Sequence, residues 1–282
     1  MHEPNLYFRP NLLADTRALI TGGGSGICKG IAQTFLALGA RVTIMGRNQS
    51  TLDDALESFG PSLHQNAFGF AGDVRDAAQV DAVLESAMES MGGLNCVING
   101  AAGNFLSPAA KLSPKGFKTV MEIDAHGTYN VSHLAYKKAL SRHGGSILNL
   151  SATLQYAGTP YQVHAGSAKA AIDAMTRHLA VEWGPEQIRV NAIAPGPIDN
   201  TVGMEKLAPG GMKKTIEGSI PLGRFGRIGE IANAAVFLTS AAAAYITGAV
   251  LVVDGGAWMT FGNVYQTAFK ANDNTTSKGD TD

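Results

Sequence analysis

A glycine-rich turn between a short apolar run and a helical stretch constrains this chain more than any other feature. The run Ala18–Thr21 is typical of a buried strand, and apolar residues follow at helical spacing, at positions 27, 31, 35 and 38. Between them stands Gly22-Gly23-Gly24-Ser25-Gly26. Glycines at such a turn let backbone N–H groups approach a phosphate at a helix N-terminus. A plain loop would not need four glycines in five residues, so the turn predicts a dinucleotide site.

Strand-like and helical stretches alternate along the rest of the chain. We expect strands over Arg41–Met45, Ala67–Phe70, Leu94–Ile98, Ser146–Leu150, Arg189–Ala194 and Ala249–Val253. We expect helical structure over Leu52–Phe59, around positions 80–88, through the amphipathic stretch Pro114–Leu140, and over Pro160–Trp183. Such alternation means parallel strands with helices on both faces. The prediction is an α/β, Rossmann-type doubly wound sheet of about seven parallel strands in a single domain.

Domain limits follow from length and local composition. The chain has 282 residues, which suits one domain, expected at residues 1–262. A segment rich in Gly, Pro and Met, at about residues 196–218, predicts a mobile lid over a substrate. The polar residues 263–282 predict a disordered tail.

Composition excludes several classes of function. The formal net charge of −1 provides no field that would attract nucleic acid or a membrane surface, and no apolar run approaches the ~18 residues of a membrane span. Cys28 and Cys96 are the only cysteines, so we expect neither a disulfide framework nor a zinc site, and no metal. The chain shows no export signal and does not end in Ser-Lys-Leu. We therefore expect a cytoplasmic protein if the source is bacterial.

Several segments resemble the short-chain dehydrogenase/reductase family. The turn Thr21–Cys28 matches the family motif Thr-Gly-x-x-x-Gly-x-Gly except that Cys28 replaces the last glycine. Asn99–Gly103, Pro195–Ile198 and Asp254–Gly256 match further family segments, and the resemblance covers roughly residues 12 to 260. We interpret Cys28 as a packing residue, with redox sensing as the alternative.

The resemblance implies which residues contact the cofactor. They are Gly22, Gly23, Gly24, Ser25, Gly26, Ile27, Arg47, Asp73, Val74, Asn99, Ala101, Lys169, Pro195, Gly196 and Ile198. Arg47 stands where NAD-binding members place an acid that holds the ribose 2′-hydroxyl. An arginine there suits a 2′-phosphate and hence NADPH, and the alternative is a solvated surface arginine.

The catalytic positions depart from the family pattern of Asn, Ser, Tyr and Lys. Asp124 occupies the asparagine position, Ser151 the serine position and Lys169 the lysine position. Ala165 stands where the family tyrosine donates a proton. Lys169 and Ala165 lie one helical turn apart on one face, so Lys169 can reach the cofactor ribose while alanine can donate nothing.

Longer strings resemble one branch of the family, the peroxisomal type of 2,4-dienoyl-CoA reductases. They are Ala101–Phe105, Gln162–Lys169, Met175–Pro185 and Gly248–Trp258. The resemblance implies NADPH-dependent reduction of a 2,4-dienoyl-CoA to a trans-3-enoyl-CoA in the β-oxidation of unsaturated fatty acids. It also implies an acyl-CoA substrate, a homotetramer and a peroxisomal location. The implied substrate contacts are Arg47, Arg75, Phe105, Ser113, Lys115 and Lys206.

The chemistry of a dienoyl thioester explains how the tyrosine can be missing. Reduction at C5 moves charge to the thioester oxygen, which needs hydrogen-bond donors more than a full proton. We assign Asp124 and Lys169 to the relay that protonates C2 through water, with Ser151 as the third catalytic residue. The alternative for Asp124 is a helix residue that bridges to a neighbour.

Two other functions remain open at this stage. One is a 3-oxoacyl or carbonyl reductase in which Tyr156 or Tyr161 acts as a displaced acid. The other is a non-catalytic NADPH-binding redox sensor that reports through Cys28. His126 and His164 flank the active positions, and we interpret both as wall or interface residues.

Overall fold

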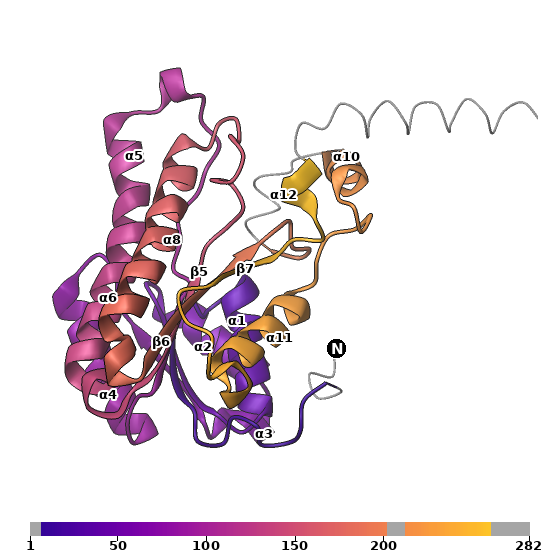
Figure 1. Cartoon of the computed structure of the whole chain (residues 1–282). Coiled ribbons are helices and arrows are strands. Elements are labelled where there is room, and N and C mark those ends of the chain that lie inside the picture. Colours follow the sequence, from indigo (N-terminus) through magenta and orange to yellow (C-terminus); the bar gives the residue numbers. More distant parts are fainter. Residues whose placement is uncertain (1–6, 202–211, 261–282) are drawn as a thin grey trace, which may run out of the picture.

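The computed structural model of the chain describes residues 7–201 and 212–260, which form one layered domain (Figure 1). In this part of the chain, seven parallel strands make a single sheet of order β3-β2-β1-β4-β5-β6-β7. The strands are β1 Arg17–Thr21, β2 Arg41–Gly46, β3 Ala67–Ala71, β4 Cys96–Asn99, β5 Gly145–Leu150, β6 Ile188–Pro195 and β7 Val250–Val253. The predicted doubly wound parallel sheet is confirmed.

Helices cover both faces of the sheet. They are α1 Gly26–Ala37, α2 Gln49–Ser58, α3 Pro61–His64, α4 Ala77–Met91, α8 Val163–Trp183, α10 Met212–Ser219, α11 Ile228–Thr239 and α12 Ala257–Thr260, with short 3₁₀ turns η1 Ala109–Lys111, η4 Gly184–Glu186 and η5 Ala241–Ala243. Side chains of β1 alternate between two cores, since Ile20 packs with the cluster of α1 and α11 and Leu19 with that of α4 and α8. Both faces of the sheet are therefore buried, as a parallel sheet requires.

The amphipathic stretch after η1 is helical almost throughout, but its geometry changes twice. It consists of α5 Pro114–Met121, the π-helical turn η2 Glu122–His126, α6 Gly127–Ala135, the π-helical turn η3 Tyr136–Leu140 and α7 Ser141–His143. A π turn inserts one extra residue into a helix and is frequent at functional sites. The turn η2 carries Asp124.

Some predicted boundaries differ from the structure. The helix expected from Pro160 begins at Val163, because Tyr161 has a φ of 66° and cannot belong to a right-handed helix. Helix α11 was not predicted. The expected lid lies partly outside the described residues, and the expected tail lies outside them entirely. None of the helices in the described ranges has the length and hydrophobicity that crossing a membrane requires.

Candidate active site

A cavity of about 940 Å³ opens at the carboxyl ends of the strands. Residues that follow β1, β2, β3, β4 and β5, together with the end of β6, form its walls. The cavity lies where the strand order reverses, between β1 and β4, which is the place where open α/β sheets bind ligands.

The glycine-rich turn shapes one wall of the cavity. Gly22 and Gly26 have φ values of 70° and 54°, which side chains other than glycine rarely adopt. A Cβ on Gly22 would also lie 2.8 Å from the carbonyl oxygen of Gly100. Ser25 precedes α1 without a side-chain cap, and Ser25, Gly26 and Ile27 line the cavity. The N-terminus of α1 can therefore receive an anionic group such as a pyrophosphate.

Charged residues border the cavity after β2 and β3. Arg47 is exposed at its edge, and Asp73 lines it. Arg75 donates from Nε to both carboxylate oxygens of Asp73 at 3.0 Å, and this bonding lowers the pKa of Asp73. Arg75 itself faces a smaller neighbouring cavity of about 380 Å³ rather than the main one.

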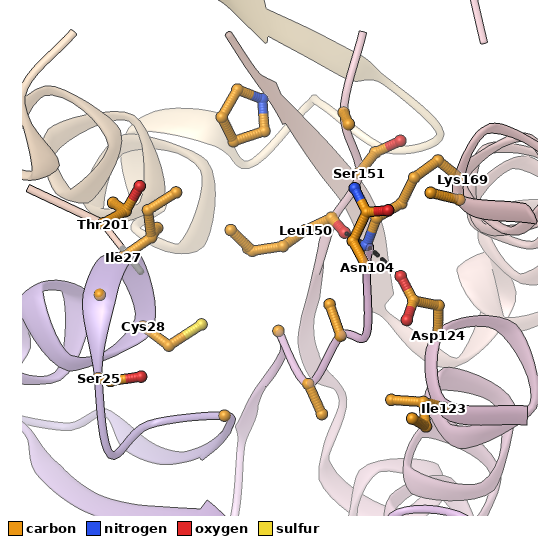
Figure 2. Close-up of a pocket in the computed structure, with 18 of the residues that line it drawn as sticks. Ser25, Ile27, Cys28, Asn104, Ile123, Asp124, Leu150, Ser151, Lys169 and Thr201 are labelled. Carbon is orange, nitrogen blue, oxygen red and sulfur yellow. Dashed lines mark hydrogen bonds and ion pairs between the residues drawn. The ribbon is translucent and has the colours of Figure 1, made fainter. Parts of the chain in front are cut away.

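Asp124 and Lys169 form a buried ion pair in the wall of the cavity. The Lys169 Nζ lies 3.0 Å from Asp124 Oδ2 and also donates to the carbonyl oxygen of Leu150 at 3.0 Å (Figure 2). Asp124 Oδ1 accepts the N–H of Gly103 at 2.7 Å. The two side chains are 45 residues apart (169 − 124), so the fold joins two of the predicted catalytic residues directly.

Ser151 lies beside this pair, but its hydroxyl proton is engaged elsewhere. Its Oγ donates to Oδ1 of Asp173 at 2.5 Å and accepts a hydrogen bond from Gln155 Nε2 at 3.2 Å. Gln155 Nε2 also donates to Asp173 Oδ2 at 2.6 Å. Asp173 is only 4% exposed, and the sequence analysis did not single it out.

No tyrosine takes the place of the missing acid within the described residues. Ala165 is buried and lines the cavity. Tyr161 is 55% exposed and does not line it. Tyr156 packs edge-on against Trp258, and burial and the charge of Asp173 raise its pKa to about 12. Neither side chain occupies the position of a proton donor.

Comparison with known proteins identifies the family. A family model described as enoyl-(acyl carrier protein) reductase matches residues 22–257. The peroxisomal 2,4-dienoyl-CoA reductase [(3E)-enoyl-CoA-producing] of Danio rerio is 49% identical over 93% of this chain and 88% of its own length. The probable 2,4-dienoyl-CoA reductase [(2E)-enoyl-CoA-producing] of Bacillus subtilis is 42% identical over 86% of this chain and 96% of its own. A crystal structure of a short chain dehydrogenase from Bacillus anthracis has a TM-score of 0.79 and 38% identity, and the match covers 87% of this chain and 97% of that one.

The chain belongs to the short-chain dehydrogenase/reductase family. Within this short-chain dehydrogenase/reductase, Cys28 departs from the family glycine motif, and its surroundings show why it is accommodated. A Cβ on Gly100 would overlap the Cys28 Sγ, so Gly100 leaves the space that the thiol occupies. Burial raises the pKa of Cys28 to about 12 and keeps the thiol protonated. These features favour packing over redox sensing.

Most of the cofactor positions predicted for this short-chain dehydrogenase/reductase line the main cavity. Those that do are Gly22, Gly24, Ser25, Gly26, Ile27, Arg47, Asp73, Val74, Ala101, Lys169, Pro195 and Gly196. Gly23, Asn99 and Ile198 do not. A Cβ on Gly23 would overlap the side chain of Ile44, Asn99 Nδ2 bonds Ser132 and Asn149, and Ile198 belongs to the core.

The predicted substrate contacts are more scattered. Phe105 is 41% exposed and packs against His164, with the ring centroids 4.4 Å apart and the rings tilted by 34°. Ser113 accepts the N–H of Gly116 at the start of α5, and Lys115 is exposed there. None of these residues lines the main cavity, and Lys206 lies outside the described residues.

Sequence reasoning also did not single out Asn104, a residue of the cavity wall. Asn104 donates from Nδ2 to Oε1 of Gln162 at 2.7 Å, and both residues line the cavity. Its Oδ1 is buried and has no hydrogen-bond partner in the described part of the chain. Its place within the string Ala101–Phe105 was the signal that could have singled it out.

Proposed function

We propose that the protein reduces 2,4-dienoyl-CoA thioesters to (3E)-enoyl-CoA with NADPH, in the β-oxidation of unsaturated fatty acids. The names of both similar proteins supply the substrate class, and the name of the Danio rerio protein supplies the (3E) product. The observation that carries the proposal to this chain is the buried Asp124–Lys169 pair beside Ala165. The cavity keeps a cation and an acid but lacks the tyrosine of ordinary ketone reduction.

The cavity fits a nicotinamide dinucleotide on three counts. A side chain on Gly22 would close the space next to Gly100, the N-terminus of α1 has no side-chain cap, and Arg47 stands at the edge. Arg47 favours NADPH because a guanidinium suits a 2′-phosphate. When bound, NADPH would supply a hydride to C5 of the dienoyl group.

The residues of the chain would then stabilise the negative charge of the intermediate and transfer the proton. Electrons displaced from the C4–C5 double bond form the dienolate, whose charge lies on the thioester oxygen. This oxygen requires hydrogen-bond donors that stabilise its charge. Lys169 holds the Asp124 carboxyl and orients the ribose. Asp124 moves a proton through water to C2, so the remaining double bond lies between C3 and C4.

The two rival functions are weaker. A carbonyl reductase would need Tyr156 or Tyr161 as the acid, yet Tyr156 packs against Trp258 outside the cavity lining and Tyr161 is largely exposed. A redox sensor would need an accessible thiolate at Cys28, yet burial holds the pKa of this thiol near 12.

The functional assay is oxidation of NADPH in the presence of either a 2,4-dienoyl-CoA or acetoacetyl-CoA. We expect turnover with the dienoyl thioester and none above background with the ketone. Turnover of the ketone alone would replace the proposal with a carbonyl reductase, and binding of NADPH without turnover of either compound would favour the sensor.

The proposal also covers the oligomeric state and the cellular compartment. A homotetramer is predicted by family resemblance, and sedimentation of the purified protein tests it. The compartment stays a prediction, cytoplasmic for a bacterial source and peroxisomal by resemblance. The contacts of Arg75, Phe105, Ser113 and Lys115 with CoA also stay predictions.

A further inference from the structure

Asp173 is a buried carboxylate to which the proposed reaction assigns no role. It lies on α8 one turn beyond Lys169 and two turns beyond Ala165, so all three share one helix face. Both of its oxygens bond the segment that follows β5. Oδ1 accepts from Ser151 Oγ, and Oδ2 accepts from Gln155 Nε2.

Every group that bonds Asp173 is a hydrogen-bond donor. The Ser151 hydroxyl and the Gln155 amide donate to it. A carboxylate accepts from both, whereas a carboxylic acid would place a proton against one of these donors. Both oxygens of Asp173 are thus held by the segment Ser151–Gln155.

This arrangement fixes the direction of the Ser151 hydroxyl. A serine has one proton, and that of Ser151 is directed at Asp173 at an O–O distance of 2.5 Å. Gln155 Nε2 occupies one of the two lone-pair positions of Ser151 Oγ. The remaining lone pair can accept a hydrogen bond, but no proton is left to donate to a substrate oxygen.

Ketone reduction needs a hydrogen-bond donor at the substrate oxygen, and this arrangement directs the Ser151 proton elsewhere. A ketone becomes an alkoxide on reduction, and the full charge on its oxygen requires a hydrogen-bond donor and then a proton, whereas a dienolate shares its charge among C4, C2 and the oxygen and depends less on one donor. Ser151 lines the cavity next to Lys169, where a substrate oxygen could accept its proton. We propose that Asp173 is a positioning residue that determines specificity, because it withholds the Ser151 proton and so excludes ketone reduction together with Ala165. The inference rests on the proposed function and deepens it.

The substitution Asp173→Asn reverses one hydrogen bond with little change in shape. The amide oxygen can remain opposite Gln155 Nε2, and the amide N–H group then faces Ser151 Oγ and donates to it. The serine proton becomes free to face the cavity. Ala165→Tyr supplies the missing acid from one turn before Lys169.

The test compares acetoacetyl-CoA reduction by NADPH in Ala165→Tyr, in Asp173→Asn and in the double variant. We expect the double variant to exceed Ala165→Tyr alone by about tenfold to a hundredfold, the usual effect of one donor at a developing oxyanion. Adding Ser151→Ala to the double variant should remove the gain in ketone reduction. If Asp173 had only a structural role, the gain would not depend on the Ser151 hydroxyl. Glu182→Gln, an exposed acid-to-amide change on the same helix, is the matched control and should produce no gain.

The inference fails if Ala165→Tyr alone reaches the activity of the double variant, or if the gain persists without the Ser151 hydroxyl. NADPH titration shows whether each variant folds, and Asp173→Leu, which also frees the serine proton, replaces Asp173→Asn if that variant does not. A folded double variant with no gain overturns the inference. A parent protein inactive on dienoyl-CoA would instead overturn the proposed function, so the two failures are distinguishable.

Discussion

At the scale of single residues, one acid and one cation carry the proposed reaction. Asp124 is 1% exposed and pairs with Lys169 at 3.0 Å, and each also bonds the backbone, at Gly103 and Leu150. Sequence reasoning predicted this pair because both residues stand at family positions. It did not predict Asp173, because nothing in the spacing of Ser151 and Gln155 indicates that the segment folds back onto α8.

We expect Asp124 and Lys169 to act as one unit. Either Asp124→Asn or Lys169→Ala should remove most of the dienoyl-CoA turnover, and the double variant should be little worse than the worse single variant. Asp124→Asn should retain NADPH binding, whereas Lys169→Ala should weaken it because the ammonium is expected at the ribose. Steady-state rates and NADPH titration of the three variants measure this. Near-parental turnover of Asp124→Asn would return Asp124 to a structural role.

Arg47 should determine the preference for NADPH. A charge-assisted hydrogen bond to the 2′-phosphate corresponds to roughly a tenfold to hundredfold difference in affinity. Arg47→Ala should remove most of the preference over NADH, and Arg142→Ala, an exposed arginine on α7, should leave it unchanged. Dissociation constants for both cofactors test the assignment, which is wrong if the parent protein shows no preference.

At the scale of elements, helix α1, which follows the glycine-rich turn, packs closely against α11. A Cβ on Gly30 of α1 would overlap Cγ2 of Ile228, the first residue of α11. Glycine in a helix normally costs stability relative to alanine, so Gly30 is retained for space.

Gly30→Ala should therefore destabilise the protein, by about 1–3 kcal/mol from overpacking. Gly229→Ala in α11 is the matched control. Nothing lies within 4 Å of its Cβ position, so this change should stabilise by about 0.5–1 kcal/mol. Urea unfolding measures both, and equal effects of the two substitutions would contradict the packing argument.

The strands could be predicted from the sequence, but some details of the helices could not. Short continuous apolar runs predict the strands well, because a parallel strand that is buried on both faces of the sheet must be apolar on both. They do not predict the π-helical turn η2 that carries Asp124, because a helical pattern of apolar residues does not indicate where the backbone bonding changes to the π form. The late start of α8 depends on the left-handed backbone of Tyr161, which a tyrosine side chain does not indicate.

At the scale of the whole molecule, the sheet order brings distant segments to one cavity. Four parts of the chain meet at the carboxyl edge of the sheet. They are the turn after β1, Asp124 of η2, Ser151 after β5 and Lys169 of α8. This meeting was predictable from the parallel topology, because the same ends of all strands lie at one edge. The conformation of the segment after β5, which directs the Ser151 proton away from the cavity, was not.

The most direct test of the account follows both added hydrogens in the product. A 2,4-dienoyl-CoA is reduced with NADPH that carries deuterium at the transferred position, and separately with ordinary NADPH in D₂O, and each product is examined by NMR. The account predicts a (3E)-enoyl-CoA with the cofactor-derived deuterium at C5 and the solvent-derived deuterium at C2. A (2E)-enoyl-CoA with solvent-derived deuterium at C4, or no product at all, would contradict it.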